Sequence, residues 1–337
     1  MLQLLNKTPF APAICLFPNK DGIDTLFIVV RATFEIGEVL RIAKNQLPPQ
    51  QQDEYWGEPA KSSVKYVSDY HIGKPSTDVC LVGHAWAPAG QAVTDLYVYL
   101  LVAEQQKALR VFGNRFWQNG QISAPEPFQT MPLVYEYAFG GTHELKSEAG
   151  ETNILLEERN PVGRGFRGER NAQELEGFPL PNIEDPENLI QTPDDTPPPA
   201  GFGFLAPTWL PRREYAGTYD EQWQKTRAPY LPDDFKPRYF NSAHPSLVFD
   251  RYLQGGEPIK LRNASINGEM DFHIPACKFS NRVRVANRTE EPPLNLETVL
   301  IEPDDNRLSL VWRAALPCDK ETLNIHEVEV NLLEIKI

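Results

Sequence analysis

Three glycines in this sequence are spaced as in a loop that binds the pyrophosphate of a dinucleotide. Gly163, Gly165 and Gly168 match the pattern G-x-G-x-x-G, whose glycines let the backbone approach a phosphate at the start of a helix. The pattern indicates nucleotide binding only where it follows a buried strand and opens a crossover helix. Here the polar segment 157–161 precedes it, and Gly177 interrupts the sequence soon after it. We therefore interpret the segment as a shaped glycine-rich loop and expect no cofactor.

Two histidines and two cysteines in the C-terminal part carry side chains that zinc prefers. These residues are His273, Cys277, Cys318 and His326. Four is the number of ligands in a structural zinc site, but such sites usually present closely spaced pairs of cysteines. Because these two cysteines are far apart in the sequence, we interpret the set as buried cysteines and ordinary surface histidines. We expect no bound metal.

Three pairs of adjacent aspartates would provide carboxylates for general acid–base chemistry. The pairs are Asp194-Asp195, Asp233-Asp234 and Asp304-Asp305, and a proline lies close to each of them. In such turns an aspartate side chain accepts hydrogen bonds from nearby backbone N–H groups. The sequence also has no G-x-S-x-G, Walker A or H-E-x-x-H motif. We therefore expect that the protein is not an enzyme.

Basic side chains recur at alternate positions of one segment near the C-terminal end. They are Lys278, Arg282, Arg284 and Arg288, and apolar residues such as Val283 occupy intervening positions. A β-strand would place the basic residues on one face. Two interpretations stay open: a solvated face, or a stripe that docks an acidic partner, for which charge sets the register and the association rate.

The elements that would position these residues are mostly strands. Segments rich in β-branched and aromatic residues predict strands over 24–36, 78–86, 96–102, 108–112, 133–139, 269–274, 295–301 and 308–316. A change in the phase of the apolar alternation predicts a β-bulge near His326 and Glu327. The 31 prolines argue against long helices. We expect a mainly β protein with an antiparallel β-sandwich-like scaffold, long ordered loops rich in proline and aromatic residues, and few short helices.

The sequence divides into an N-terminal β region (1–176), an insertion rich in proline and aromatic residues (177–241) and a C-terminal β region (242–337), all within one continuous domain. Disordered segments are poor in aromatic residues, whereas this insertion contains many. We therefore expect an ordered loop wrapped on the core. A capping box of Thr218 and Glu221 predicts one short helix inside it.

The composition limits the class of partner and the cellular compartment. The chain has 337 residues and a net charge of −13, which argues against nucleic acid as a partner, since phosphates attract a basic surface. Its four cysteines are scattered, as in a reduced cytoplasmic protein. Residues 1–10 lack the features of a signal peptide, and no apolar segment is long enough to span a membrane. We expect a cytoplasmic protein that binds neither nucleic acid nor membrane.

Short segments spread over most of the chain occur in a characteristic order. They lie at 6–10, 29–34, 137–142, 160–166, 180–184, 202–207, 238–243 and 255–259, and include Asn-Lys-Thr-Pro-Phe at 6–10 and Tyr-Ala-Phe-Gly-Gly-Thr at 137–142. No single segment is specific. In this order they resemble a family of domains of uncharacterised function that are encoded in bacterial type VI secretion clusters, beside genes for VgrG spike, PAAR-tip and toxin proteins.

The resemblance implies an accessory adaptor or chaperone. Such a protein binds a protein toxin effector, or its PAAR-containing part, and helps to load it onto the VgrG spike. Members of the family are not known as enzymes and have no catalytic residues to transfer. Two alternatives stay open: a carbohydrate-active hydrolase, because aromatic clefts with paired acids suit sugars, and a structural component of the spike.

The residues that we expect to contact a partner fall into three groups. They are the loop residues Gly140, Gly141, Asn160, Pro161, Gly163, Gly165 and Phe166, the aromatic residues Trp209, Tyr219, Trp223 and Tyr230 of the insertion, and the basic residues Lys278, Arg282 and Arg284. The loop residues would be either architectural or partner-facing. Large aromatic residues dominate binding energy at interfaces, although these would equally serve to pack the insertion on the core.

Overall fold

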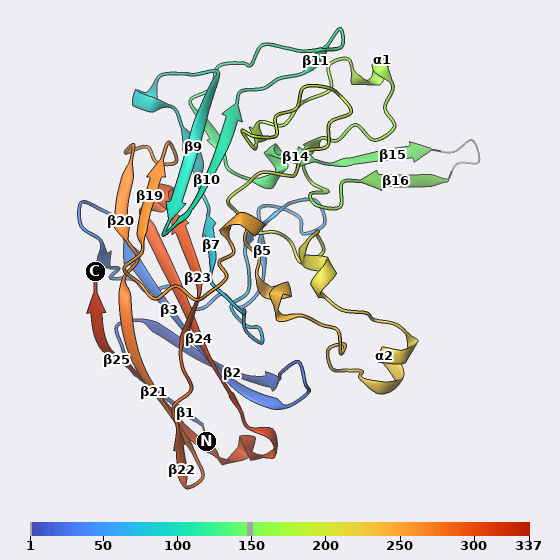
Figure 1. Cartoon of the computed structure of the whole chain (residues 1–337). Helices are drawn as coiled ribbons and strands as arrows, with labels where there is room; N and C mark the ends of the chain where they lie inside the picture. Colours follow the sequence, from blue (N-terminus) through green and yellow to red (C-terminus); the bar gives the residue numbers. More distant parts are fainter. Residues whose placement is uncertain (1, 147–150) are drawn as a thin grey trace.

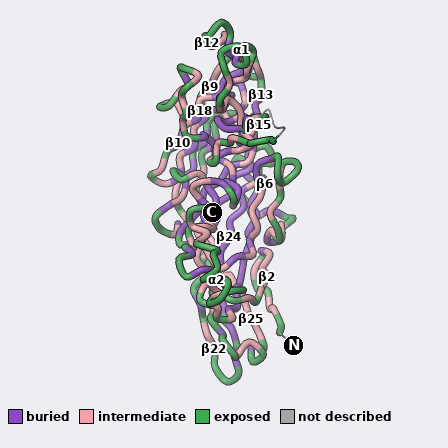
Figure 2. Tube along the Cα trace, turned by 90° about the vertical axis from the view of Figure 1, so that its right-hand side faces the viewer, coloured by how far each residue is buried: buried purple, intermediate pink, exposed green. Residues whose placement is uncertain are grey.

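The computed structural model of the protein describes residues 2–146 and 151–337. Strands dominate it and the helices are few and short (Figure 1), so the predicted mainly β class with sandwich-like sheets is confirmed. The molecule is elongated, and its buried residues follow the long axis between exposed loops and edges (Figure 2). None of the helices in the described ranges is long and apolar enough to cross a membrane.

A central sheet contains strands from both the N-terminal and the C-terminal part of the chain. Its strands, in order, are β2 (Ala11–Pro18), β3 (Asp24–Glu35), β24 (Arg307–Pro317), β23 (Asn295–Glu302) and β7 (Asp78–Leu81), and β4 (Arg41–Ile42) also pairs with β3. The pair β23 and β7 is parallel, and the other pairs are antiparallel. Nearly every residue of β3 is buried. Other parts of the protein therefore cover both faces of this strand, which explains its continuous apolar sequence.

A second sheet packs against the central sheet and completes the sandwich. Its strands, in order, are β1 (Gln3–Lys7), β25 (Ile325–Lys336), β21 (Ala276–Val285) and β22 (Arg288–Glu290). Aromatic rings join the two sheets: the ring of Phe279 on β21 lies edge-on to Trp312 on β24, with centroids 5.1 Å apart. Phe10 stacks on the same tryptophan at 6.5 Å. These contacts place one continuous apolar core between the sheets.

The β-bulge predicted near His326 is confirmed. Arg284 of β21 pairs with Glu327 of β25, and Val285 pairs with Ile325, so His326 is the extra residue. The bulge restores the inward direction of the apolar side chains on either side of it, because one additional residue changes the face to which side chains point.

A third sheet forms the other end of the molecule. Its strands, in order, are β18 (Ile183–Glu184), β10 (Gln105–Phe112), β9 (Asp95–Val102), β19 (Pro258–Arg262) and β20 (Met270–His273). The strands predicted over 96–102 and 108–112 are present as β9 and β10, which form a hairpin; both are longer than predicted, and the turn has only the residues 103–104. Alternate residues of β9 are buried, so this sheet covers the core with one face.

Two predicted strands are wrong in detail. The segment 78–86 forms two strands, because Gly83 accepts a hydrogen bond from the backbone N–H of Leu133 (3.0 Å) and the chain changes sheet there. The second piece, β8 (His84–Trp86), pairs with β13 (Thr130–Pro132). The segment 133–139 contains a 3₁₀ turn, where Tyr135 lies in the core. Its apolar alternation reflects this packing and not a strand.

The remaining elements are short. The two-stranded pairs are β5 (Glu54–Tyr55) with β6 (Val64–Tyr66), β11 (Trp117–Gln118) with β12 (Gln121–Ile122), β14 (Phe139–Gly140) with β17 (Arg164–Gly165), and β15 (Thr142–Lys146) with β16 (Thr152–Leu156). The α-helices are α1 (Ala172–Leu175) and α2 (Glu221–Thr226). The 3₁₀ segments are η1 (Pro88–Gly90), η2 (Tyr135–Tyr137), η3 (Arg212–Tyr215), η4 (Pro237–Phe240), η5 (Pro245–Leu247), η6 (Pro303–Asp305) and η7 (Asp319–Asn324).

The segment 177–241 follows the scaffold and contributes buried rings to its core. Phe202 and Phe204 are buried within the main apolar cluster. The predicted helix is present as α2, but the prediction of its cap is wrong. Asp220 accepts the N–H of Trp223 (2.8 Å) as the N-cap residue, whereas the Thr218 hydroxyl donates to Asp234 (2.8 Å). A carboxylate adjacent to the first turn therefore replaces the more distant threonine.

Candidate functional surface

The glycine-rich loop is folded inward around Asn160. This side chain is fully buried, and its Nδ2 donates to the carbonyl oxygens of Tyr135 (2.8 Å) and Phe139 (2.9 Å). The backbone carbonyl oxygen of Asn160 accepts the N–H of Gly141 (2.8 Å). The loop thereby connects the parallel strands β14 and β17, which pair Gly140 with Gly165. The four-residue helix α1 that follows is too short for the crossover helix of a dinucleotide-binding unit.

The glycines of this loop allow its backbone segments to touch. A Cβ atom at Gly140 would overlap the backbone carbonyl oxygen of Asn160, and one at Gly163 would overlap Nδ2 of the Asn160 side chain. Gly165 has φ +90°, and a Cβ there would lie 2.7 Å from Cδ of Pro181. The loop residues are therefore architectural.

The prediction of this loop as a partner surface is corrected by its burial. Gly140, Gly141 and Asn160 are buried. The other loop residues are half-buried: Pro161, Gly163, Gly165 and Phe166. Phe166 packs against a small satellite core that contains Phe139 and Leu180. The satellite core explains why the loop has an aromatic residue, and it leaves little of the loop for a partner.

The four aromatic residues of the insertion divide into one core residue and three surface residues. Trp209 is 4% exposed and lies edge-on to the ring of Tyr135, with centroids 5.7 Å apart. Its prediction as a partner anchor is therefore wrong, because the ring is already buried in the core. Tyr219, Trp223 and Tyr230 instead lie on a small projection formed by residues 215–236, here named the α2 lobe.

The α2 lobe is held together by polar bonds and exposes its tyrosines. Tyr219 is 54% exposed, and its ring lies edge-on to Trp223, with centroids 4.8 Å apart. Nε1 of Trp223 donates to the carbonyl oxygen of Tyr230 (2.8 Å), whose ring is exposed beside the β2–β3 turn. Nη2 of Arg227 donates to the Lys20 carbonyl oxygen (2.8 Å) of that turn. The lobe is therefore fixed to the scaffold while two aromatic faces stay in solvent.

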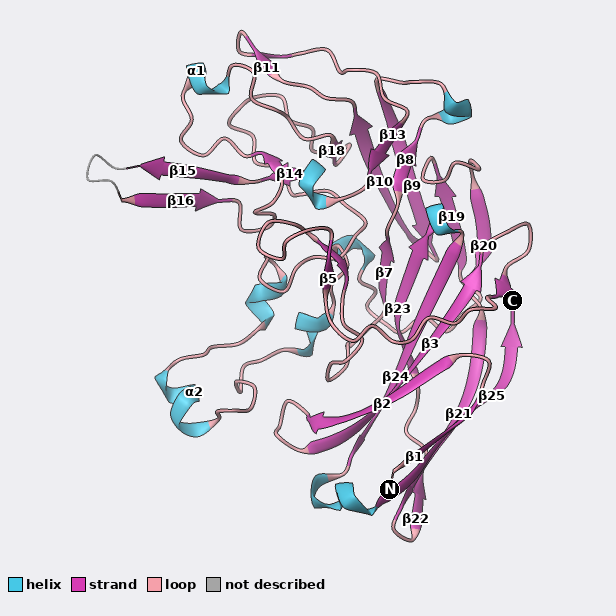
Figure 3. Ribbon diagram, turned by 180° about the vertical axis from the view of Figure 1, so that it is seen from behind, coloured by secondary structure: helices cyan, strands magenta, loops and turns pink. Residues whose placement is uncertain are grey.

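The β15–β16 hairpin is a second projection with exposed apolar side chains. Within the described part of the chain, these two strands pair only with each other. Ile154 and Leu156 of β16 are exposed. The hairpin and the α2 lobe project from the same side of the molecule in the front view (Figure 1) and in the view from behind (Figure 3). The sequence prediction missed the hairpin, because its only signal was a few apolar residues within a charged segment.

The two arginines of β21 are exposed but paired with acids. The guanidinium of Arg282 lies 3.2 Å from a carboxylate oxygen of Glu291, and that of Arg284 lies 3.2 Å from Glu327. Lys278 is also exposed, and Glu334, which lies opposite it in the strand register, forms its ion pair with Lys336 (3.2 Å). Glu291 and Glu327 offset the charges of the arginines, so the geometry favours the solvated face over the docking stripe.

Two of the aspartate pairs each contain a carboxylate that caps a local turn. Asp195 accepts backbone N–H groups of Gln191 and Thr192 (both 2.8 Å), and these bonds lower the pKa of its carboxyl group. Asp234 accepts the backbone N–H of Thr218 (2.9 Å), with the same direction of pKa shift and the same cause. For these two residues, the predicted turn role is confirmed.

The four possible zinc ligands lie apart. Among residues 2–146 and 151–337, no three histidine, cysteine or acidic side chains are grouped as a metal site. Cys277 is half-buried, and burial raises the pKa of its thiol to about 12. The Cys318 thiol donates to the carbonyl oxygen of Leu316 (3.0 Å). Both thiols are therefore held in the neutral form that binds metal poorly.

A buried ionic network lies on one side of the central sheet, and the sequence prediction missed it. Nε of Arg313 donates to Glu297 (2.7 Å), and Nζ of Lys74 donates to Asp78 (2.9 Å). Burial raises the pKa of the Glu297 carboxyl despite the Arg313 charge beside it. The signal in the sequence was a set of charged residues within otherwise apolar strands, such as Arg31 in β3.

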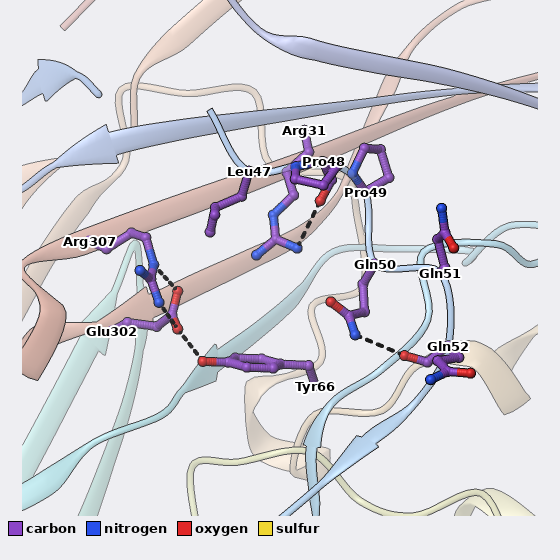
Figure 4. A pocket seen from close by; sticks show the side chains of 10 residues that line it. All are labelled: Arg31, Leu47, Pro48, Pro49, Gln50, Gln51, Gln52, Tyr66, Glu302 and Arg307. Atoms are coloured by element: carbon purple, nitrogen blue, oxygen red, sulfur yellow. Dashed lines mark hydrogen bonds and ion pairs between the residues drawn. The ribbon is translucent and has the colours of Figure 1, made fainter. Parts of the chain in front are cut away.

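Arg31 also lies at the edge of a hollow in the protein surface. This cavity of about 560 Å³ is lined by Arg31, Leu47, Pro48, Pro49, Gln50, Gln51, Gln52, Tyr66, Glu302 and Arg307 (Figure 4). The cavity lies between the central sheet and the segment that leads into β5 and β6. Its residues come from four separate parts of the chain, so only the tertiary structure brings them together.

Comparison with known proteins identifies one family. The family described as "Uncharacterized protein conserved in bacteria (DUF2169)" matches residues 21–313. The match covers most of the central sheet, the insertion and the third sheet. No curated protein and no solved structure matches the chain.

Proposed function

The chain belongs to the DUF2169 family of uncharacterized proteins conserved in bacteria, and we propose that it acts as an accessory adaptor or chaperone for a protein toxin effector. In this proposal it holds the toxin, or its PAAR-containing part, in the cytoplasm and helps to load it onto the VgrG spike of a type VI secretion system. The choice of partner rests on the sequence segments that resemble domains encoded beside VgrG, PAAR and toxin genes.

One observation carries the proposal of protein binding: two separate projections expose apolar side chains on the same side of the molecule. We name this the docking face and define it by Ile154 and Leu156 of β16 and Tyr219 and Tyr230 of the α2 lobe. Apolar side chains placed outside the core on fixed projections gain free energy when a partner covers them.

The two projections would bind a partner in different ways. Among the described residues, β15 and β16 pair with no third strand, so their outer edges can offer backbone N–H and C=O groups to an additional strand of the partner. The tyrosines of the α2 lobe offer large rings with few rotatable bonds, so ordering them on binding costs little entropy. A partner that engages both projections would gain affinity from two linked contacts.

The test is co-purification with the toxin encoded next to this gene. We expect the wild-type protein to retain the toxin, and a variant with Ile154→Ser, Leu156→Ser, Tyr219→Ala and Tyr230→Ala to lose it. True hot spots contribute about 2 kcal/mol or more each, so loss of the whole face would remove detectable complex. Delivery of the toxin to neighbouring cells should decrease in parallel.

The matched control is an exposed apolar residue outside the docking face. Leu323 on η7 is 92% exposed, and the Leu323→Ser variant should bind the toxin as the wild type does. Far-UV circular dichroism and urea unfolding would establish that each variant is folded. Undiminished co-purification by the folded quadruple variant would exclude the docking face, and normal toxin delivery after deletion of the gene would exclude the adaptor role.

A further inference from the structure

Arg31 is a charged residue in a place where the fold otherwise has apolar side chains. It lies in the middle of β3, between Val30 and Ala32, which are fully buried, and it is itself only 6% exposed. Its guanidinium points into the cavity between Leu47 and Tyr66 (Figure 4). Burying a cation is costly unless its donors are satisfied, so the number of its hydrogen bonds is informative.

The guanidinium of Arg31 has spare donor capacity. Nη1 donates to the carbonyl oxygen of Pro48 and Nη2 to Oγ of Ser309, both at 3.4 Å, which is near the outer limit for a hydrogen bond. Nε is buried and has no partner. The nearest acid, Asp69, is 3.8 Å from Nη1, and burial raises the pKa of that carboxyl. Arg31 therefore lacks the close bidentate partner that a buried arginine normally has.

Arg307, on the opposite wall, shows the contrasting case. Its Nε and Nη2 both donate to the carboxylate of Glu302 (2.7 Å each), and Nη2 also donates to Asp305 (2.6 Å). The hydroxyl of Tyr66 completes this group by donating to Glu302 (2.6 Å). The charge of Arg307 is thus offset by a bidentate pair with Glu302 and by Asp305, whereas Arg31 has no carboxylate within hydrogen-bond distance.

The walls of the cavity restrict the kind of acceptor. Leu47, Pro48 and the ring of Tyr66 form an apolar side, while Gln51 and Gln52 place amide groups at the exposed rim. Glu302 and Asp305 would repel a second negative charge, so a dianion such as phosphate is disfavoured. A single carboxylate has the shape that fits the planar fork of an arginine.

We propose that this cavity binds a monocarboxylate, whose carboxylate accepts hydrogen bonds from Arg31 and whose apolar body lies against Leu47, Pro48 and Tyr66. The site goes beyond the proposed adaptor role, since its residues are not those of the docking face. Two sources have the required chemistry: a free carboxylic acid, and the C-terminal carboxylate of a peptide. The glutamine amides at the rim suit the peptide, whose backbone would offer partners to them.

Isothermal titration of the full chain with defined probes tests the site. The probes are hexanoate, N-acetyl-leucyl-alanine with a free carboxylate, the C-terminal amide of the same dipeptide, and inorganic phosphate. We expect at least one carboxylate to bind, and the amide to bind at least about tenfold more weakly than the free dipeptide, because a bond to a charged acceptor is lost. Binding of the dipeptide alone indicates a peptide terminus, and binding of hexanoate indicates a free acid.

Two variants connect the binding to the cavity. Arg31→Met removes the donors with a side chain of similar length, and should abolish binding of the carboxylates. Leu47→Trp leaves Arg31 in place and fills the cavity, so it should also abolish binding if Arg31→Met fails to fold. The docking-face variant serves as the control and should bind the probes normally.

Three results would overturn the proposal: no binding of either carboxylate at millimolar concentration, equal binding of the amide, or tighter binding of phosphate. Carboxylate binding that survives Leu47→Trp would place the ligand elsewhere on the protein. None of these results depends on the toxin, so failure of this site and failure of the adaptor function are distinguishable.

Discussion

The loop around Asn160 and the α2 lobe both contain residue types that are common at binding sites, but the fold uses them in opposite ways. Asn160 is buried and bonds to two carbonyl groups, whereas the lobe leaves Tyr219 and Tyr230 in solvent. In this protein, glycine and asparagine at a close backbone crossing form an interior joint. The aromatic residues of the lobe instead contact one another on a short projection, which is the surface that we propose for a partner.

The largest expected difference in stability is between alanine variants of two tryptophans, one in the core and one on the α2 lobe. Trp209→Ala should destabilise the protein by about 3–5 kcal/mol, because it leaves a cavity in the core beside Tyr135. Trp223→Ala on the lobe should cost only about 1 kcal/mol, mainly from its bond to the Tyr230 carbonyl. Urea unfolding measures both changes. Equal losses would show that the lobe is part of the core and not a separate projection.

The second test compares two glycines that both have positive φ. Gly140→Ala should destabilise by about 3 kcal/mol or more, because its Cβ would overlap the Asn160 carbonyl oxygen. Gly177→Ala is the matched control: φ is +76° and nothing lies within 4 Å of the added atom, so only the backbone cost of about 1 kcal/mol applies. A tolerated Gly140→Ala, measured by thermal and urea unfolding, would contradict the interior joint.

A third test uses pH at the contact between His244, the N-cap residue of η5, and Lys107 of β10. His244 accepts a hydrogen bond from the Ser246 N–H at Nδ1 (3.2 Å), and its Nε2 lies 3.4 Å from Nζ of Lys107. Burial, followed by the Lys107 charge, lowers the pKa of His244 to about 3. The unfolded chain has a histidine pKa of about 6.5, so it binds the proton first as the pH falls.

Protonation of His244 in the unfolded chain therefore lowers the free energy of unfolding as the pH falls from about 6.5 towards about 3. The His244→Gln variant should lose less free energy of unfolding than the wild type between about pH 7 and about pH 5. Urea unfolding at both pH values measures the difference. An identical loss in the two proteins would show that His244 is not held neutral by the fold.

The smallest effect on stability is expected at the tip of the α2 lobe. Tyr219→Ala should change the free energy of unfolding by no more than about 0.5 kcal/mol, because more than half of the side chain is exposed. The same variant should weaken toxin binding, measured by co-purification and by titration of the purified toxin. A large loss of stability would instead assign Tyr219 to packing of the lobe.

The fold could be predicted from the sequence where the position of a strand follows from the apolar pattern of that strand alone. The strands β3, β23 and β24 are long apolar segments, and the bulge at His326 follows from a change in alternation within one strand. The prediction was wrong at Gly83 and at Tyr135, where contacts with distant segments determine the backbone. The cap of α2 was also wrong, since Asp234, far from the helix in sequence, competes for Thr218.

The candidate sites were predicted less well because they depend on which side of the chain faces the core. Trp209 and Tyr219 are both aromatic residues among prolines, and nothing near them in the sequence distinguishes the buried ring from the exposed one. The basic residues of β21 were found on one face as predicted, but the acids that offset its arginines lie on β25 and just after β22. The cavity at Arg31 was missed, because its walls come from segments more than two hundred residues apart.

The sequence by itself determined the mainly β class, the positions of the long strands and the presence of a glycine-rich loop unlike that of a dinucleotide-binding enzyme. These properties follow from local alternation, proline content and short-range spacing, which act within one segment. Only the tertiary structure decided that Asn160 is buried, that the α2 lobe and the hairpin share a side, and that Arg31 faces a cavity. Burial and charge compensation are set by contacts between distant segments, and the order of residues in one segment does not contain them.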